Sequence, residues 1–245
     1  MMISTYTRFE LLRAIRNKRF FLFSIGFPFV LYVVIAGPQK HDQNFGGSGV
    51  PASLYYMVGM VAFGTMTAML SAGARIASER QVGWTRQLRI SPLKPRAYFR
   101  TKIVTAYMMA SLTIGVLYLT GAAFGVRIPA DRWVEMTVLI LAGLIPFGAA
   151  GIVLGHVLTP DSIGPVMGGG TALLALLGGV WFPIANGTII YDVARALPTY
   201  WLVQAGHVGT GDAGWGPLGV VVITGWTIVF SILAVWAYRR DSGRA

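Results

Sequence analysis

The side chains that could do acid–base or metal chemistry are few in this sequence and lie far apart. There is no cysteine, and the three histidines, His41, His156 and His207, are scattered. Neither the H-E-x-x-H pattern of zinc hydrolases nor the G-x-x-x-x-G-K-S/T pattern of ATP-binding loops occurs. His156 stands five residues before Asp161, which suggests either a proton relay or a packed histidine. We favour the packed histidine and expect no catalytic residue, no metal ligand and no cofactor bound by this chain.

The composition excludes an ordinary soluble domain. Hydrophobic residues make up 55% of the 245 residues and charged residues only 12%, where a soluble domain has about 25% charged residues. The formal net charge of +11 would favour nucleic-acid binding if the basic residues formed a patch on a polar domain. They lie instead between long uncharged runs, so we interpret the charge as a signal of membrane topology and expect no nucleic-acid partner.

Six uncharged runs are each long enough to cross a bilayer. A helix rises about 1.5 Å per residue, so roughly 20 apolar residues cross a hydrocarbon core of about 30 Å. In lipid the backbone polar groups must be satisfied within each segment, which a helix achieves. The sequence therefore predicts an all-α integral membrane protein, with residues 1–245 forming one transmembrane domain of six transmembrane helices. The predicted spans cover about 20–38, 53–74, 103–125, 136–158, 163–183 and 215–238.

Two further segments are expected to lie along the membrane rather than to cross it. Residues 1–19 mix apolar and basic side chains, which predicts an N-terminal interfacial helix. Residues 184–206 follow Pro183 and contain Pro198, and their apolar part is too short to cross comfortably. We expect an outer re-entrant segment there, because a seventh crossing would put the C-terminus outside.

The distribution of basic residues predicts the orientation. Of the 20 Lys and Arg residues, 16 fall in three segments: the first 19 residues, residues 75–102, and the tail from residue 239. Cytoplasmic loops carry an excess of Lys and Arg. Both termini and the loop between spans two and three are therefore predicted to be cytoplasmic.

That loop contains a short amphipathic stretch over residues 78–93. Apolar Trp84, Leu88 and Ile90 alternate with basic residues, and Pro92 would end a helix at Ser91. Its arginines could simply hold the loop to anionic headgroups, or the stretch could be a docking surface for another protein.

The chain resembles type-2 ABC transporter permeases, the six-span exporter subunits of bacteria. The loop matches that family's pattern of an acid, a Gly, a Leu and a Ser before Pro at Glu79, Gly83, Leu88, Ser91 and Pro92. The basic entry into span one, residues 13–20, and the stretches 178–184 and 194–201 around the end of span five are also similar.

The resemblance implies a transporter of two permease chains and two copies of a separate P-loop ATPase, which binds ATP and Mg²⁺. It places the chain in the bacterial plasma (inner) membrane. On this resemblance 79–92 is a coupling helix that docks on the ATPase, and its expected contacts are Glu79, Arg80, Gly83, Trp84, Arg86, Leu88 and Pro92. The expected outer re-entrant motif comprises Trp181, Phe182, Pro183, Pro198, Tyr200 and Trp201.

The leading functional hypothesis is export of a hydrophobic or amphipathic compound, such as an antibiotic, drug or lipid, because the spans contain no rings of charge that would select an ion. Export of a glycan or lipid-linked polysaccharide is one alternative, and a non-transporting sensing or resistance module is another. The second permease chain is expected to be identical, with span one packed against span five of the partner. The G-x-x-x-G pairs Gly121–Gly125 and Gly151–Gly155 predict close helix contacts within the chain, whereas Gly168–Gly170 could mark a dimer contact or a flexing helix.

Overall fold

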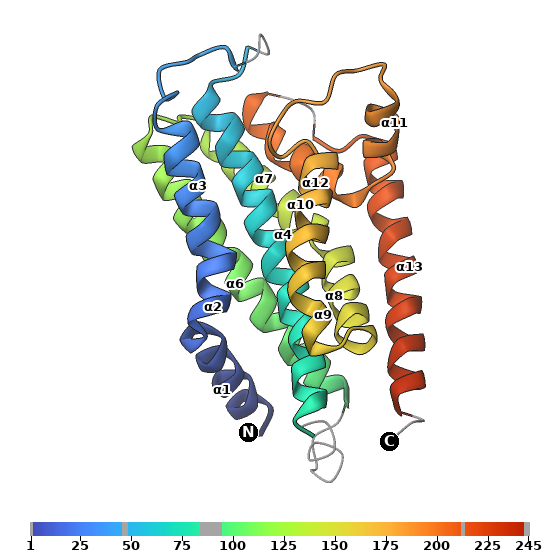
Figure 1. The fold of residues 1–245 in the computed structure, drawn as a ribbon. Coiled ribbons are helices and arrows are strands. Elements are labelled where there is room, and N and C mark those ends of the chain that lie inside the picture. The colour runs from blue at the N-terminus through green and yellow to red at the C-terminus, as the bar shows by residue number, and fades with distance from the viewer. Residues whose placement is uncertain (1, 46–48, 84–94, 212–213, 243–245) are drawn as a thin grey trace.

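The computed structural model describes residues 2–45, 49–83, 95–211 and 214–242, and the secondary structure of that part of the chain is helical throughout. The helices form an elongated bundle (Figure 1). This confirms the predicted all-α class.

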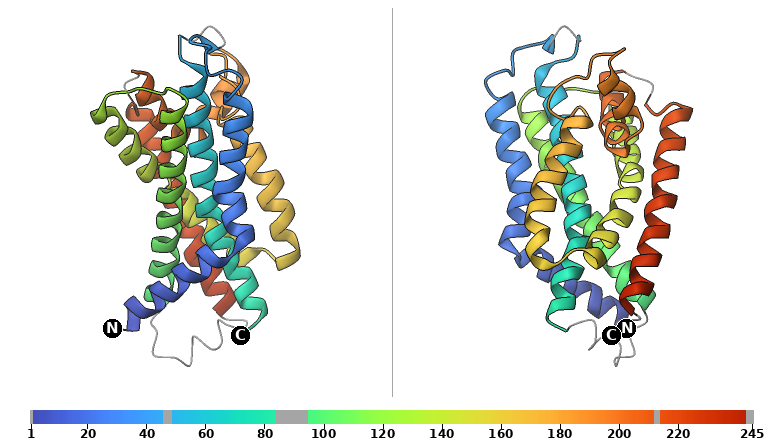
Figure 2. Two further views of the ribbon diagram at one scale, coloured as in Figure 1. Left: turned by 90° about the vertical axis from the view of Figure 1, so that its left-hand side faces the viewer. Right: turned by 45° about the vertical axis from the view of Figure 1, so that its right-hand side comes forward.

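The N-terminal part of the chain is an inclined helix followed by a second, continuous helical run. It comprises α1 (Met2–Arg16), α2 (Lys18–Phe21), the π-helical turn η1 (Leu22–Gly26) and α3 (Phe27–Ala36). Figure 2 shows α1 inclined to the axis of α3. Residues 18–36 are helical without interruption, which corresponds to about 28 Å and matches the hydrocarbon core. Helices therefore form over both the predicted interfacial segment and the predicted first span. The position of α1 at the membrane surface stays a prediction.

The central element is α4 (Ala52–Gln81), whose apolar stretch is almost entirely buried. It packs against α3, α6 (Pro95–Ala123), α8 (Ile145–Val157) and α12 (Pro198–His207). The contact with α8 is close because Gly73 of α4 faces Gly151 and Gly155, where an added Cβ would collide with the opposite backbone. The predicted G-x-x-x-G contact at Gly151–Gly155 is thus confirmed as a contact within the chain.

The remaining helices include one bent pair and one broken run. The single residue Leu144 separates α7 (Ala130–Gly143) from α8, and Pro146 stands in the first turn of α8. The broken run consists of α9 (Pro160–Pro165), a second π-helical turn η3 (Val166–Gly170) and α10 (Thr171–Leu177). The elements after it, apart from α12, are α11 (Ile189–Arg195), the 3₁₀ turn η4 (Val208–Thr210) and α13 (Pro217–Ser242).

Four helical stretches in the described residues are long and apolar enough to cross a membrane. They are Ala52–Gln81, Ala97–Ala123, Ala130–Val157 and Pro217–Asp241. The first and fifth predicted spans are helical as well, but π-helical turns divide each of them into shorter pieces. The count of six crossings stays a prediction.

One predicted boundary is corrected by a glycine. α10 ends at Leu177, six residues before the predicted end of span five. Gly179 has φ +75°, and the amides of Gly179 and Val180 donate to the carbonyls of Leu176 and Ala175. This is a Schellman turn, which a left-handed glycine stabilises and which stops the helix before the aromatic pair.

The two ends of the bundle are formed by different segments of the chain. The start of α1, the end of α4, the start of α6 and the end of α13 share one end (Figure 1). The connection after α3 and the helices α11 and α12 lie at the opposite end. The segments rich in basic residues therefore share one end of the bundle, as the topology prediction requires.

Candidate functional site

The end of α4 that precedes residues 84–94 carries two adjacent charged residues, Glu79 and Arg80. Successive residues of an α-helix point about 100° apart, so their side chains leave α4 in different directions. Glu79 reaches α1 and α6, whereas Arg80 reaches α8 and α13. Two neighbouring residues thus connect α4 to four other helices.

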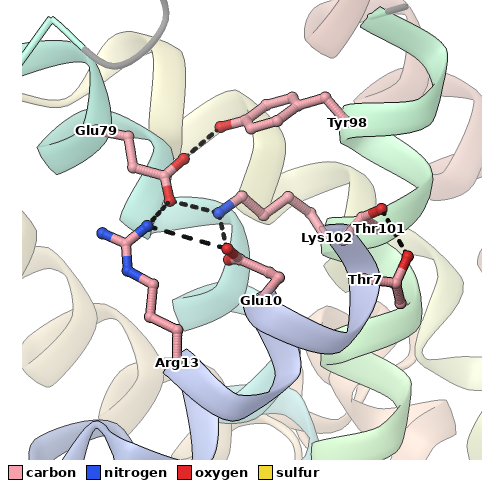
Figure 3. A network of polar contacts seen from close by, with 7 residues as sticks. All are labelled: Thr7, Glu10, Arg13, Glu79, Tyr98, Thr101 and Lys102. Carbon is pink, nitrogen blue, oxygen red and sulfur yellow. Dashed lines mark hydrogen bonds and ion pairs between the residues drawn. The ribbon is translucent and has the colours of Figure 1, made fainter. Parts of the chain in front are cut away.

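Glu79 is the centre of a carboxylate cluster formed by Glu10, Arg13, Glu79, Tyr98 and Lys102 (Figure 3). The Nζ of Lys102 lies 2.5 Å from Oε1 of Glu79 and 2.6 Å from Oε1 of Glu10. Arg13 donates to Oε1 of Glu79 at 3.1 Å, and the Tyr98 hydroxyl donates to Oε2 of Glu79 at 2.6 Å. The cluster therefore joins α1, α4 and α6 around one carboxylate.

The charges of this cluster balance, and most of them are buried. Lys102, Glu79 and Glu10 are only 2%, 3% and 4% exposed, whereas the side chain of Arg13 is largely exposed. A buried charge is tolerated when it is paired and hydrogen-bonded, and removing one partner of a buried ion pair costs about 3–5 kcal/mol. A further bond, 3.1 Å between the hydroxyls of Thr7 and Thr101, joins α1 to α6 beside the cluster (Figure 3). The cluster therefore holds α1 in a defined position against the bundle.

Arg80 makes a second connection. It donates to the carbonyl oxygens of Gly155 and His156, at 3.3 and 2.8 Å, in the last turn of α8. It also forms an ion pair with Asp241 near the end of α13. The last carbonyls of a helix have no partner within the helix and carry partial negative charge, so a guanidinium there satisfies and stabilises them.

The structure places the predicted ATPase-docking residues in three situations. Glu79 is buried in the carboxylate cluster, and Arg80 is half-buried against α8 and α13. Gly83, with φ +72°, follows the end of α4. The other four predicted contacts, Trp84, Arg86, Leu88 and Pro92, lie outside the described residues. In this structure Glu79 is therefore an anchor inside the bundle, and docking by the remaining residues stays a prediction.

Sequence reasoning missed the partners of Glu79 and Arg80. Glu79 is bonded to Arg13, Tyr98 and Lys102, Arg80 is bonded to Asp241, and Glu10 joins the cluster through Lys102. A signal was present: Glu10 is the single acid of a basic segment, and Lys102 directly precedes an apolar run. Ionisable residues next to membrane spans need partners, but the sequence does not say which residues pair across three helices.

His156 is packed, as the sequence interpretation favoured. Its Nδ1 lies 2.9 Å from the carbonyl oxygen of Ile152, and its ring contacts Phe99 and Tyr238 at centroid distances of 6.0 and 5.8 Å. Among the described residues no group of three or more His, Cys, Asp or Glu side chains is placed to hold a metal ion.

The predicted outer motif is divided between a turn and a helix. Trp181, Phe182 and Pro183 form the turn after α10, where Phe182 is exposed and Trp181 packs on Phe63 at 5.6 Å. Pro198 begins α12. The turn is held to α4 by the Tyr55 hydroxyl, which donates to the Gly179 carbonyl at 2.9 Å.

Trp201 anchors the helices of the outer segment. Its indole donates to the Arg195 carbonyl at 2.8 Å, and its own carbonyl accepts from the indole of Trp215 at 2.7 Å. Tyr200 packs edge-on against Tyr191, and burial raises the pKa of Tyr200 to about 12, which keeps the phenol neutral. The segment 184–206 thus contains α11 and most of α12, which these hydrogen bonds and ring contacts hold together. The depth of the two helices in a membrane stays a prediction.

Comparison with known proteins gives two matches. The model of the family described as "ABC-2 family transporter protein" matches residues 38–237. The "Putative transport permease YvfS" of Bacillus subtilis (strain 168) is 25% identical over 245 residues, an alignment that covers 95% of each chain.

Proposed function

This chain belongs to the ABC-2 family of transporter proteins, and from that membership we propose that it is the permease subunit of an ATP-driven exporter. It moves a hydrophobic or amphipathic compound, such as an antibiotic, drug or lipid, out of the cytoplasm or the inner leaflet. A separate P-loop ATPase binds ATP and Mg²⁺, because this sequence has no P-loop. The name of the Bacillus subtilis relative, a transport permease, supports a role in transport.

The observation that carries the proposal is the pair of connections at the end of α4. Residues 84–94 join α4 to α6, and Glu79 and Arg80 stand just before them. Glu79 links α4 to α1 and α6, and Arg80 links it to α8 and α13. A displacement of the loop by an ATPase would therefore pull on α4 and, through two charged connections, on four further helices.

The assembly proposed is two identical permease chains with two ATPase subunits. Large apolar side chains stay exposed on the first and fifth predicted spans, among them Leu22 and Phe23 on η1, and Leu173 and Leu176 on α10. Lipid or a second chain can cover such faces. We place span one of one chain against span five of the other, in the bacterial plasma membrane with both termini cytoplasmic.

The test is co-expression of the tagged full-length chain with each P-loop ATPase of the same genome. An ATPase should copurify with the wild type, and apolar compounds should stimulate its ATP hydrolysis. Trp84→Asp/Leu88→Asp should reduce copurification at least about tenfold, because each buried apolar side chain contributes about 1.5–3 kcal/mol. The matched control is Phe182→Asp/Ile189→Asp, which adds the same charges at exposed positions of the opposite end.

Three outcomes bear on the alternatives. Failure of every ATPase to copurify with the wild type would favour a non-transporting sensing module. Equal copurification of the two double variants would remove the loop as the docking element. If neutralising Arg86 and Arg89 then loosens the membrane association of the loop while the ATPase still copurifies, the loop is assigned to lipid headgroups. Stimulation by glycans rather than by apolar compounds would identify a glycan exporter.

A further inference from the structure

A cavity of about 680 Å³ lies between the N-terminal helical run, α4 and the α9–α10 run. Pockets that enclose drug-sized ligands have volumes of about 300–1,000 Å³. The residues of α4 that line it extend from Phe63 to Ser78, which spans about 22 Å along the helix axis. The cavity is therefore long enough for a molecule with two chemically different ends.

One end of the cavity is aromatic. Phe63 of α4 lies 6.0 Å from Phe27 and 5.6 Å from Trp181 between ring centroids, and all three rings line the cavity. Aromatic rings provide large apolar contact areas in preferred tilted arrangements. This end suits an apolar tail.

The other end is polar and carries a positive charge. Ser71, Arg75 and Ser78 of α4 line it, together with Asn17. Arg75 is the one charged residue among the described residues that line the cavity, and no carboxylate lines it there. This end suits an anionic group.

The charges around Arg75 strengthen this reading. Glu10 and Glu79, the two carboxylates of the cluster, are both bonded to Lys102. Arg13 is bonded to Glu79 as well, so the cluster supplies two positive charges for its two carboxylates. Charge in a cleft with apolar walls acts over a longer distance than in water.

We propose that this cavity binds an anionic amphiphile of drug size, with its acidic group at Arg75 and its apolar part among Phe27, Phe63 and Trp181. The proposal rests on the proposed function, because it names the class of compound that the exporter moves. A cationic amphiphile of equal length would meet a like charge at the polar end and bind less well.

The test is native mass spectrometry of the full-length chain in a neutral detergent, with dodecyl phosphate and dodecyltrimethylammonium as probes. Dodecyl phosphate should bind saturably, at least about tenfold more tightly than the cation. Arg75→Gln should weaken binding of the phosphate at least about tenfold and should tighten binding of the cation, because the like charge is removed. Arg195→Gln removes an arginine that does not line the cavity and should change neither.

A second variant keeps the test valid if Arg75→Gln fails to fold. Gly168 lines the cavity, and an added Cβ there would meet nothing within 4 Å. Gly168→Phe should fill the space and abolish saturable binding. Gly169→Phe is the matched control, since Gly169 has the same open surroundings and does not line the cavity.

Four results would overturn the proposal. The first is equal binding of the two probes, and the second is binding that survives Gly168→Phe. The third is displacement of dodecyl phosphate by phosphatidylglycerol with the same dependence on Arg75. The fourth is a dimer that binds neither probe and dissociates on Gly168→Phe. The third would make the cavity a site for bilayer lipid, and the fourth a contact between two copies. Because binding is measured without an ATPase, failure here leaves the copurification test of the exporter untouched.

Discussion

Lys102→Met is the sharpest test of the carboxylate cluster. The Lys102 Nζ touches Oε1 of Glu10 and of Glu79, so these oxygens are at most about 5 Å apart. Two negative charges at that distance repel by about 3 kcal/mol at an effective dielectric constant of about 20. Arg13 can compensate one of them. The loss of unfolding free energy should therefore be about 3–5 kcal/mol, as expected for a broken buried ion pair.

The assay is unfolding of the purified chain by SDS titration in mixed micelles, followed by circular dichroism. Glu10→Gln added to Lys102→Met removes the excess negative charge and should recover about 1–3 kcal/mol. Lys40→Met, at an exposed position, is the control and should change stability by less than about 0.5 kcal/mol. The reasoning is refuted if Lys102→Met behaves like Lys40→Met, or if the double variant is no more stable than Lys102→Met alone.

Three other predictions follow from the packing and the topology. Arg80→Met should destabilise the last turns of α8 and α13 by about 1.5–3 kcal/mol, seen as faster hydrogen exchange there; unchanged exchange would contradict it. Gly73→Ala should lower the unfolding free energy by about 1–3 kcal/mol, because its Cβ would lie 2.1 Å from a carbonyl carbon of α8. Gly225→Ala, in open space, should raise the unfolding free energy by up to about 1 kcal/mol, and a Gly73→Ala variant more stable than Gly225→Ala would contradict this packing. In this cysteine-free chain, an impermeant reagent added to intact cells should label Ile189→Cys and spare Val82→Cys, both at exposed positions, and the reverse pattern would invert the topology.

Helices were predictable from the sequence because a long apolar run in lipid has few alternatives. The residues at which the helices end were harder to predict. The second predicted span stopped at residue 74, before the charged residues, yet α4 continues to Gln81. It can continue because Glu79 and Arg80 find partners on other helices. Such tertiary pairing leaves no local signal in α4 itself.

The glycines show the same limit. Gly151 and Gly155 pack against α4 as their spacing predicts, and so does Gly121, where an added Cβ would collide with Met57. Gly125, the second glycine of that pair, instead has φ +88° and lies after the end of α6. Its amide donates to Ala122 and that of Val126 to Gly121, so it forms a C-terminal turn. One spacing thus serves two purposes, and only the position of the helix end separates them.

Contacts with other helices hold α4 in place at both of its ends, and the candidate site depends on both sets of contacts. At one end Glu79 and Arg80 are held by charge to α1, α6, α8 and α13. At the other end the Tyr55 hydroxyl holds the turn after α10, and Val58 packs so closely on Gly206 of α12 that a Cβ there would lie 2.2 Å away. A helix of 30 residues extends about 45 Å and transmits displacement along its axis because its packed neighbours have discrete arrangements. Motion imposed on the loop after Gly83 would therefore reach the outer turn at Trp181, which also forms the aromatic end of the cavity. The proposed ATPase contact and the proposed cargo site are in this way connected by one buried helix.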